Sequence, residues 1–255
     1  MIHPSAIVHP NAQIERGVEI GPYCLIGEHV KIGSGTILQA HVVINGWTTL
    51  GQDCHVYPFA TLGAASQDKK YVGERAYTKI GDRTVIREYV SIQRATGEEE
   101  VTSVGNDCLF LAYVHIAHNC IVGDGVTMSN LAQVAGHCEI GDHANIGGMA
   151  GLHQFTRVGR YAMVGGASKL TRDLPPFFLV EGNPAQPHGL NSVGLRRAGF
   201  SLPERSEIKK FYKMFYSPSL NMSQAVAAMK AEAQTEPGKE IVAFLETKSQ
   251  RGVLK

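Results

Sequence analysis

Aliphatic residues recur at every sixth position along the first two thirds of the chain. Steps of six from Ile2 to Leu170 give 29 positions, and all but three of these are apolar. The next position is often glycine, as at Gly21, Gly123 and Gly165. An α-helix repeats every 3.6 residues and an ordinary strand every two, so neither explains this pattern. A period of six predicts a short strand and a tight turn, repeated many times.

Three hexads make one triangular coil, so residues 18 apart should lie on neighbouring rungs about 4.8 Å apart. We therefore predict an all-β fold, a parallel β-helix shaped as a triangular prism with roughly nine coils. The three exceptions, Asp68, Glu74 and Glu98, fall in polar stretches without the repeat. These stretches predict loops inserted near 64–79 and 93–103.

The repeat ends near Leu170, and the proline-rich stretch "DLPPFFLVEGNPAQP" follows soon afterwards. Beyond it the pattern becomes helical, and Ser201 and Glu204 have the spacing of a capping box. We predict a β-helix over residues 1–185 and a small α-helical C-terminal domain over 186–255. Such a domain would cover the open end of the coil, as repeat proteins require.

Charge and hydropathy exclude several classes of partner. The net charge is +1 and no block of like charge occurs, which argues against nucleic acid as the main partner. The N-terminal residues do not have the pattern of a secretory signal, and no apolar run is as long as a membrane span. We expect a cytoplasmic protein with no membrane span.

The cysteines share one slot of the repeat. Each stands at a multiple of six, where other hexads have alanine, valine or threonine facing inward. We therefore expect core packing, and neither a disulfide, a zinc site nor a cysteine nucleophile. The five are Cys24, Cys54, Cys108, Cys120 and Cys138.

Four of the eleven histidines, His115, His118, His137 and His153, fall in outward or corner slots of neighbouring coils. His118 and His137 differ by one coil plus one residue, so we expect them roughly 5–7 Å apart. Spacing alone leaves a solvated ladder and a functional cluster equally open. A cluster would suit acid–base chemistry, and no activated serine or cysteine nucleophile stands beside it, which favours direct transfer. Surface positions are expected for His3, His9, His29, His41, His55 and His143.

A flat prism face is not a pocket, so a second wall must come from the 66–78 loop or from another subunit.

Several motifs are shared with a known family. "HIAHNC", "GLHQF" and "GLRRAGF", with "HVVINGWTTLGQD" and "IGGMAGLHQF", make the chain resemble the UDP-N-acetylglucosamine O-acyltransferases over essentially its whole length. The resemblance implies a left-handed β-helix, a homotrimer with active sites between subunits, and no cofactor or metal. It also implies transfer of a 3-hydroxyacyl group from acyl carrier protein to the 3-hydroxyl of UDP-N-acetylglucosamine, the first step of lipid A synthesis.

The resemblance assigns roles to individual residues. His118 matches the general base, and the backbone N–H of Gly136 matches the donor to the developing oxyanion. Gly166 falls where the family measures acyl length, and a residue without a side chain there should admit a longer tail. The sugar nucleotide and acyl chain would be held by Asp68, Lys70, His115, His137, His153, Gln154, Asn191 and Arg197.

The chain also departs from the family pattern. Asn119 follows the base where aspartate is frequent, and an amide can orient the ring but cannot supply the charge that would stabilise an imidazolium. Val193 replaces an acidic nucleotide contact, and Ala198 replaces a second arginine. We therefore expect fewer polar contacts to the nucleotide.

Two other enzymes and a bare structural β-helix remain as alternatives. A related sugar-nucleotide N-acyltransferase normally has an extra N-terminal domain, whereas the hexads here begin at Ile2. A zinc-dependent hydratase on the same coil would need three histidines converging from two subunits, and His115, His118 and His137 could supply them. The acidic acyl carrier protein should dock on basic residues, and the candidates are Arg157, Arg160, Lys169 and Arg172.

Overall fold

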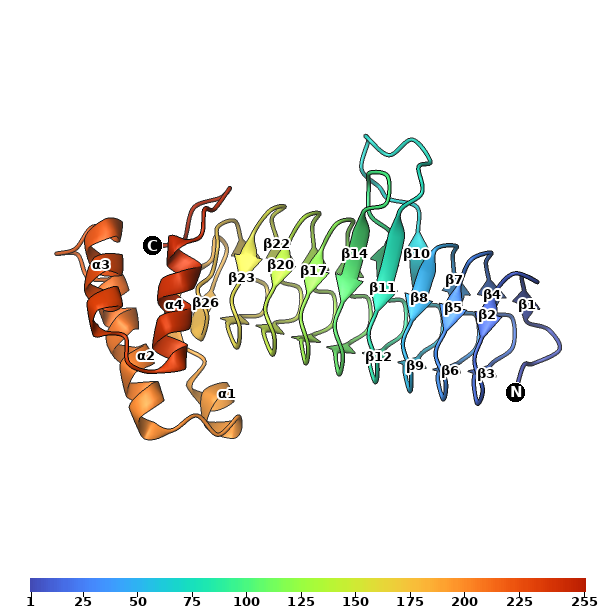
Figure 1. Ribbon diagram of the computed structural model, residues 1–255, viewed down its shortest axis with the longest axis horizontal. Helices are drawn as coiled ribbons and strands as arrows, with labels where there is room; N and C mark the ends of the chain where they lie inside the picture. The colour runs from blue at the N-terminus through green and yellow to red at the C-terminus, as the bar shows by residue number, and fades with distance from the viewer.

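The computed structural model describes residues 1–255 and shows a long β-helix closed at one end by helices (Figure 1). The strands are mostly two residues long, and each strand up to β22 pairs in parallel with the strand three elements further along the chain. Residues 18 apart are therefore partners, as in Leu25 with Val43 and Ile26 with Ile44. The prediction of a left-handed β-helix built from hexapeptides is confirmed.

The strands form three sheets, one for each face of the prism. Sheet one contains β1 (Ile7–Val8), β4 (Leu25–Ile26), β7 (Val43–Ile44), β10 (Thr61–Ala64), β13 (Ser91–Gln93), β16 (His115–Ile116), β19 (Gln133–Val134), β22 (Gly151–Leu152) and β25 (Lys169–Leu170). Sheet two contains β2 (Gln13–Ile14), β5 (Lys31–Ile32), β8 (Thr48–Leu50), β11 (Tyr77–Ile80), β14 (Val101–Val104), β17 (Ile121–Val122), β20 (Glu139–Ile140) and β23 (Arg157–Val158). Sheet three contains β3 (Glu19–Ile20), β6 (Ile37–Leu38), β9 (His55–Val56), β12 (Val85–Ile86), β15 (Leu109–Phe110), β18 (Thr127–Met128), β21 (Asn145–Ile146), β24 (Met163–Val164), β26 (Phe178–Glu181) and β27 (Gln186–Leu190).

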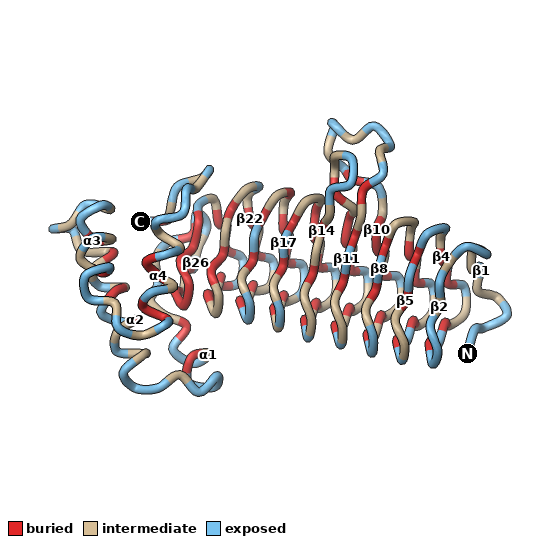
Figure 2. Tube along the Cα trace, in the orientation of Figure 1, coloured by how far each residue is buried: buried red, intermediate tan, exposed pale blue.

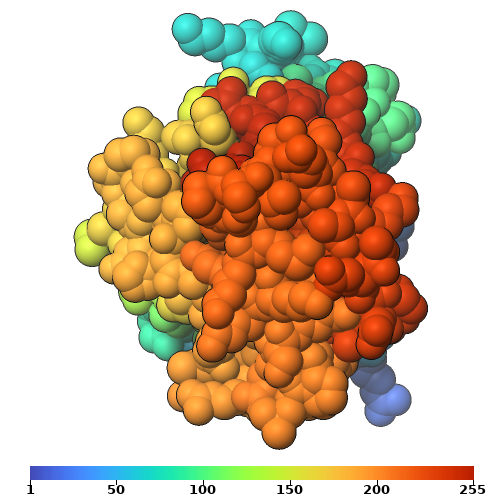
Figure 3. All heavy atoms as spheres, turned by 90° about the vertical axis from the view of Figure 1, so that its left-hand side faces the viewer, coloured from blue at the N-terminus to red at the C-terminus, as the bar shows by residue number.

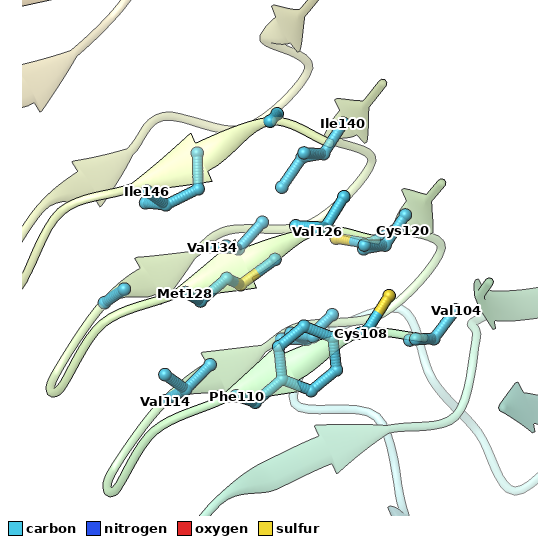
Figure 4. Close-up of a cluster of buried hydrophobic side chains, with 14 of the residues drawn as sticks. Val104, Cys108, Phe110, Val114, Cys120, Val126, Met128, Val134, Ile140 and Ile146 are labelled. Atoms are coloured by element: carbon cyan, nitrogen blue, oxygen red, sulfur yellow. The ribbon is translucent and has the colours of Figure 1, made fainter. Parts of the chain in front are cut away.

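The aliphatic residues of the repeat fill the prism interior, which Figure 2 shows as a buried line along each face. Figure 4 shows the layers: Phe110, Met128 and Ile146 follow one another on successive rungs. All five cysteines are free and buried, as predicted. Burial raises the pKa of the Cys108 thiol to about 11, which makes it a poor nucleophile.

Each coil turns at three corners. The first corner joins sheet one to sheet two, the second joins sheet two to sheet three, and the third joins sheet three back to sheet one. Most turns contain a residue with positive φ, such as Asn119 (56°), Asp107 (57°) and Tyr113 (64°). In two other coils the position before the positive-φ residue is occupied by proline, Pro22 and Pro58. A tight turn of this kind allows proline at that position.

Both inserted loops leave the prism at the first corner (Figure 1). The first joins β10 to β11 across residues 65–76, and the second joins β13 to β14 across 94–100. The Ser66 and Thr96 hydroxyls are 2.7 Å apart, and Glu74 Oε1 accepts from the Gly97 N–H at 2.7 Å. The two loops therefore support each other.

Four helices follow the coil and cover its end, as the end-on view of Figure 3 shows. They are α1 (Ser192–Arg197), α2 (Leu202–Phe215), α3 (Met222–Glu232) and α4 (Glu236–Glu246). Ser201 and Glu204 form the capping box of α2. The antiparallel strand β27 pairs with β26, so it belongs to the third sheet although it lies beyond residue 185. No helix is long and apolar enough to cross a membrane.

Two of the four residues predicted to dock acyl carrier protein, Arg157 and Arg160, are paired with carboxylates. Arg157 donates to Asp173 at 2.7 Å, and the Asp173 side chain is fully buried. Arg160 donates to Glu240 of α4 at 2.7 Å. Arg157 also lies over the Phe244 ring of α4 at 4.5 Å, so both guanidinium groups contact α4. Of the four residues, only Lys169 and Arg172 are exposed without a carboxylate partner.

Candidate active site

His118 stands in the first-corner turn between β16 and β17, just before the left-handed residue Asn119. Its Nδ1 lies 2.9 Å from the Asn119 side-chain oxygen. One rung further on, the His137 ring meets the His118 ring edge to face with centroids 5.1 Å apart, inside the predicted range. Phe155 stacks on His137 at 4.7 Å on the following rung, so the His137 ring is held between two neighbours.

A cleft of about 360 Å³ opens beside His118, along the outer surface of sheet one. The first inserted loop forms one wall through Gln67. The lining residues are Gln67, Gln93, His115, Ala117, His118, Gln133, Val134, Ala135, Gly136, Gly151 and Leu152. The mixture of amides, imidazoles and small apolar groups suits a polar acceptor next to an apolar tail.

Gly136 lies directly against the base. A Cβ at this position would be 2.5 Å from both Cε1 and Nε2 of His118, so only glycine leaves room for the ring. The Gly136 N–H donates to no group of the chain. Gly136 holds the same turn slot as Pro22 and Pro58, where the repeat leaves the backbone nitrogen without a ladder partner. A free N–H donor therefore lies beside His118.

Asp68 brings the first inserted loop to the histidines. Its Oδ2 is 3.9 Å from His118 Nε2, and its Oδ1 accepts from the Lys70 N–H at 3.0 Å. The Lys70 N–H, followed by the charges of His118, Lys70 and His137, lowers the pKa of the Asp68 carboxyl. The carboxylate is thus charged at neutral pH and faces the base.

His115 is a neighbour of the cleft rather than of the base. Its Nδ1 lies 2.7 Å from the Ser91 hydroxyl on the adjacent strand of sheet one. Burial lowers the pKa of His115, with a smaller contribution from His118. Burial also lowers the pKa of His137, again with help from His118. Since both pKa values lie below the ordinary imidazole value, the neutral rings predominate at pH 7 and can donate or accept hydrogen bonds along the cleft.

The nucleotide residues assigned by resemblance lie on another face of the prism. Asn191 and Arg197 line a second hollow of about 490 Å³ over sheet three, together with Val193. The Asn191 side chain caps α1 by accepting from Gly194 N–H and also donates to the Tyr161 carbonyl. Asn191 therefore holds the turn that presents Arg197. Within one chain, this hollow and the cleft at His118 are separate and share no lining residue.

The remaining assigned residues lie at two corners of the prism: His153 and Gln154 at the first corner and Gly166 at the third. Gln154 occupies the turn slot one rung beyond Gly136, and His153 precedes it with its Nδ1 3.2 Å from the Gln154 carbonyl. Gly166 is exposed at the third corner, where an added Cβ would meet only the Gly148 carbonyl at 3.4 Å. The space above Gly166 is therefore open.

Three residues could offer atoms to a metal: Asp68, His118 and His137, with ligand atoms within 4.8 Å of one another. The Asp68 to His118 separation of 3.9 Å exceeds the roughly 3.4 Å of ligands around tetrahedral zinc. His115 Nδ1 is engaged with Ser91. The hydratase alternative needs histidines that converge from two subunits, so it stays a prediction.

Sequence reasoning missed Ser66, Gln93, Thr96 and Gln133. Gln133 pairs with His115 across sheet one, so a step of 18 from His115 would have found it. Gln93 is buried, and its Oε1 accepts from the Gln67 N–H at 3.3 Å. Ser66 and Thr96 lie in the inserted loops, where no period relates them to the coil.

Comparison with known proteins gives matches over the whole chain. The family model for the bacterial transferase hexapeptide repeat matches residues 1–33, and the model for UDP-N-acetylglucosamine O-acyltransferase domain 2 matches residues 173–254. An acyl-[acyl-carrier-protein]–UDP-N-acetylglucosamine O-acyltransferase from Thermodesulfovibrio yellowstonii is 47% identical, covering 96% of this chain and 95% of that protein. The chain belongs to this family. The family resemblance is confirmed, and the protein is an acyltransferase.

Further members of the UDP-N-acetylglucosamine O-acyltransferase family agree in sequence and fold. The protein of this name from Herminiimonas arsenicoxydans is 42% identical over 100% of this chain and 99% of its own. LpxA from Acinetobacter baumannii superimposes with a TM-score of 0.96 at 40% identity, covering 100% of this chain and 99% of that one. LpxA from Bacteroides fragilis gives 0.97 at 36% identity, with both chains fully covered.

Proposed function

We propose that the protein transfers a 3-hydroxyacyl group from acyl carrier protein to the 3-hydroxyl of UDP-N-acetylglucosamine, as the first step of lipid A synthesis in the cytoplasm. The observation that carries the proposal is the pairing of the His118 ring with the free Gly136 N–H inside one cleft. A base and an oxyanion donor side by side are what acyl transfer from a thioester requires. The names of the relatives supply the two substrates.

The chemistry proceeds without a covalent enzyme intermediate. His118 Nε2 removes the proton from the sugar 3-hydroxyl as its oxygen attacks the thioester carbon, and the Gly136 N–H donates to the oxygen that becomes negative. The C–S bond then breaks. The imidazolium returns the proton to the departing thiolate of the carrier protein, so the enzyme ends as it began. One such N–H donor is typically worth about 3–4 kcal/mol.

We further propose that the complete site forms between two copies in a homotrimer. The cleft at His118 lies on sheet one and the hollow at Arg197 lies on sheet three, two faces that share the third corner. A three-fold rotation about an axis near that corner brings sheet one of each copy against sheet three of the next.

The outward residues of the three faces support this arrangement. Sheet one exposes Ile7 and Leu25, and sheet three exposes Ile37, whereas sheet two exposes Ile121 among the charged residues Lys31, Lys79 and Glu139. Apolar faces are the ones that association buries. The third corner adds a column of stacked rings with centroids about 5 Å apart: Tyr23, His41, Phe59, Tyr89 and Tyr113.

The first test measures transfer from 3-hydroxyacyl carrier proteins of several lengths to UDP-N-acetylglucosamine, for the native protein and for His118→Ala. Product from the native protein and a loss of at least 100-fold in the variant, with the oligomer intact, are expected. Unchanged transfer by the variant would remove His118 as the base. No transfer at any length would reject the reaction and direct attention to a 3-amino acceptor and to zinc analysis.

The composite site has its own test. The His118→Ala and Arg197→Ala proteins are denatured and refolded, each alone and as an equal mixture of the two. If His118 and Arg197 of one site come from different copies, random mixing restores about a quarter of the sites. No recovery in the mixture, with the native protein refolding fully as the control, would place both residues in one subunit. Light scattering gives the number of copies.

A further inference from the structure

The Asn119 side chain is held at both ends by a single residue of the second inserted loop. The Thr96 N–H donates to Asn119 Oδ1 at 2.9 Å, and Asn119 Nδ2 donates to the Thr96 carbonyl at 3.0 Å. Turning the amide round would place two donors together at one end and two acceptors at the other. The main chain of Thr96 therefore fixes which end of the amide faces His118.

The end that faces His118 is the oxygen. Asn119 Oδ1 lies 2.9 Å from His118 Nδ1, and an amide oxygen can only accept. The hydrogen of this contact must belong to Nδ1, so the neutral ring has its lone pair on Nε2. We infer that Asn119 and the Thr96 main chain form a positioning group that sets the tautomer of His118.

The inference rests on the proposed function, because a base needs its lone pair at the nitrogen that faces the substrate. Nε2 is the nitrogen on the cleft side: it faces Asp68 at 3.9 Å and the space where a Gly136 Cβ would lie. In the opposite tautomer Nε2 would carry a hydrogen and could not accept the hydroxyl proton.

The same group connects the base to the loop of Asp68. The Thr96 hydroxyl contacts the Ser66 hydroxyl at 2.7 Å, and Ser66 Oγ accepts from the Asp68 N–H at 3.1 Å. The turn that contains His118 and Asn119 is also held by Thr102, whose Oγ1 accepts from the Asn119 N–H at 2.8 Å. His118 and Asp68 are thus positioned by one continuous set of hydrogen bonds.

The second loop is matched to an amide at position 119. An aspartate there would still accept from the Thr96 N–H and from His118 Nδ1. Its second oxygen would face the Thr96 carbonyl, about 3 Å away, with no hydrogen between them. Asparagine therefore orients the ring and binds the loop, where aspartate would orient the ring and repel the loop.

The direct test reads the tautomer in the native full-length protein. Two-bond proton–nitrogen correlation spectra of protein labelled with ¹⁵N-histidine distinguish the two neutral tautomers, at about pH 8, well above the ordinary imidazole pKa. The His118 signal is assigned by its absence in His118→Gln. We expect Nδ1 protonated and Nε2 bare. A bare Nδ1 would overturn the inference.

Variants then connect the tautomer to the reaction. Asn119→Leu removes the acceptor, and we expect loss of the Nδ1–H tautomer and a fall in kcat of about 100-fold with little change in KM for the sugar nucleotide. Asn119→Asp should keep the tautomer and lose less than about tenfold in kcat. An Asn119→Leu protein that folds and keeps both the tautomer and kcat would contradict the inference.

A matched control is available in the same coil. Asn106 at the second corner accepts from the Asp82 N–H and donates to Asp124, so Asn106→Leu removes similar bonds away from the cleft. It should leave kcat unchanged. The two proposals also fail separately: native transfer with a bare Nδ1 rejects the positioning group alone, and a protonated Nδ1 without transfer rejects the reaction alone.

Discussion

The second corner and the first corner have the same backbone but use it differently. At the second corner the free turn N–H is capped by a side chain from the next coil: Gln52 N–H donates to Asp82, Asp82 N–H to Asn106, and Asn106 N–H to Asp124. At the first corner the Gly136 N–H has no such cap, and the residue in the capping slot is Gln154. The repeat leaves this turn N–H free in many coils, and what distinguishes the site is that the free N–H of Gly136 lies beside the His118 ring.

Gly136→Ala is the largest disturbance of the first corner. The added Cβ would lie 2.5 Å from His118 Cε1 and Nε2, so the ring must move out of the cleft. We expect kcat to fall by about 10³-fold, because misplacing a catalytic group by about 1 Å already costs about 100-fold. The fold should survive, since Gly136 has no positive φ and the nearest atoms to the added Cβ belong to the His118 ring. Activity equal to native, with an unchanged melting temperature, would remove the close contact from the mechanism.

Gln154→Asp is designed to make the first corner resemble the second. By analogy with Asp124 and Asp142, the new carboxylate should accept from the turn N–H one coil earlier, here that of Gly136. Occupying one oxyanion donor should lower kcat by about 10²-fold. Gln154→Ala is the control, because it removes the amide without adding a cap. Equal kcat for the two variants would show that the Gly136 N–H is not the donor.

Asp124→Ala opens the second corner instead. It removes hydrogen bonds to the Asn106 N–H at 2.6 Å and the Asn106 side chain at 3.1 Å. We expect a loss of about 1 kcal/mol in the free energy of unfolding, and no change in kcat. Denaturant unfolding and the transfer assay measure the two quantities. A clear loss of kcat would mean that the corners are coupled rather than separate in function.

The smallest effect concerns pH and the histidines of the cleft. Burial lowers the pKa of His115 and His137 in the folded protein, so the unfolded chain takes up protons first as the pH falls. These residues therefore cost no stability above about pH 6.5, and they reduce stability progressively below it. His115→Gln should make the decline between about pH 6.5 and 5 shallower. An identical pH dependence in the variant would exclude His115 as a source.

The sequence determined the coil by itself. A residue every six positions must face inward, so the 18-residue arithmetic gave the core, the buried cysteines and the neighbouring rings of His118 and His137. It also indicated that the polar stretches leave the prism. The period works because each rung repeats the hydrogen bonds of the last, which makes position in the chain equivalent to position in space.

Tertiary structure decided what the period does not describe. The repeat offers no carboxylate partner for Arg157 and Arg160, because Asp173 and Glu240, which pair with them, lie beyond it, where no spacing rule applies. Thr96 likewise reaches Asn119 from a loop of irregular length. The sheets can be derived from local hydrophobic pattern, whereas the orientation of His118 depends on which loop atoms arrive beside it, and only the folded chain brings them there.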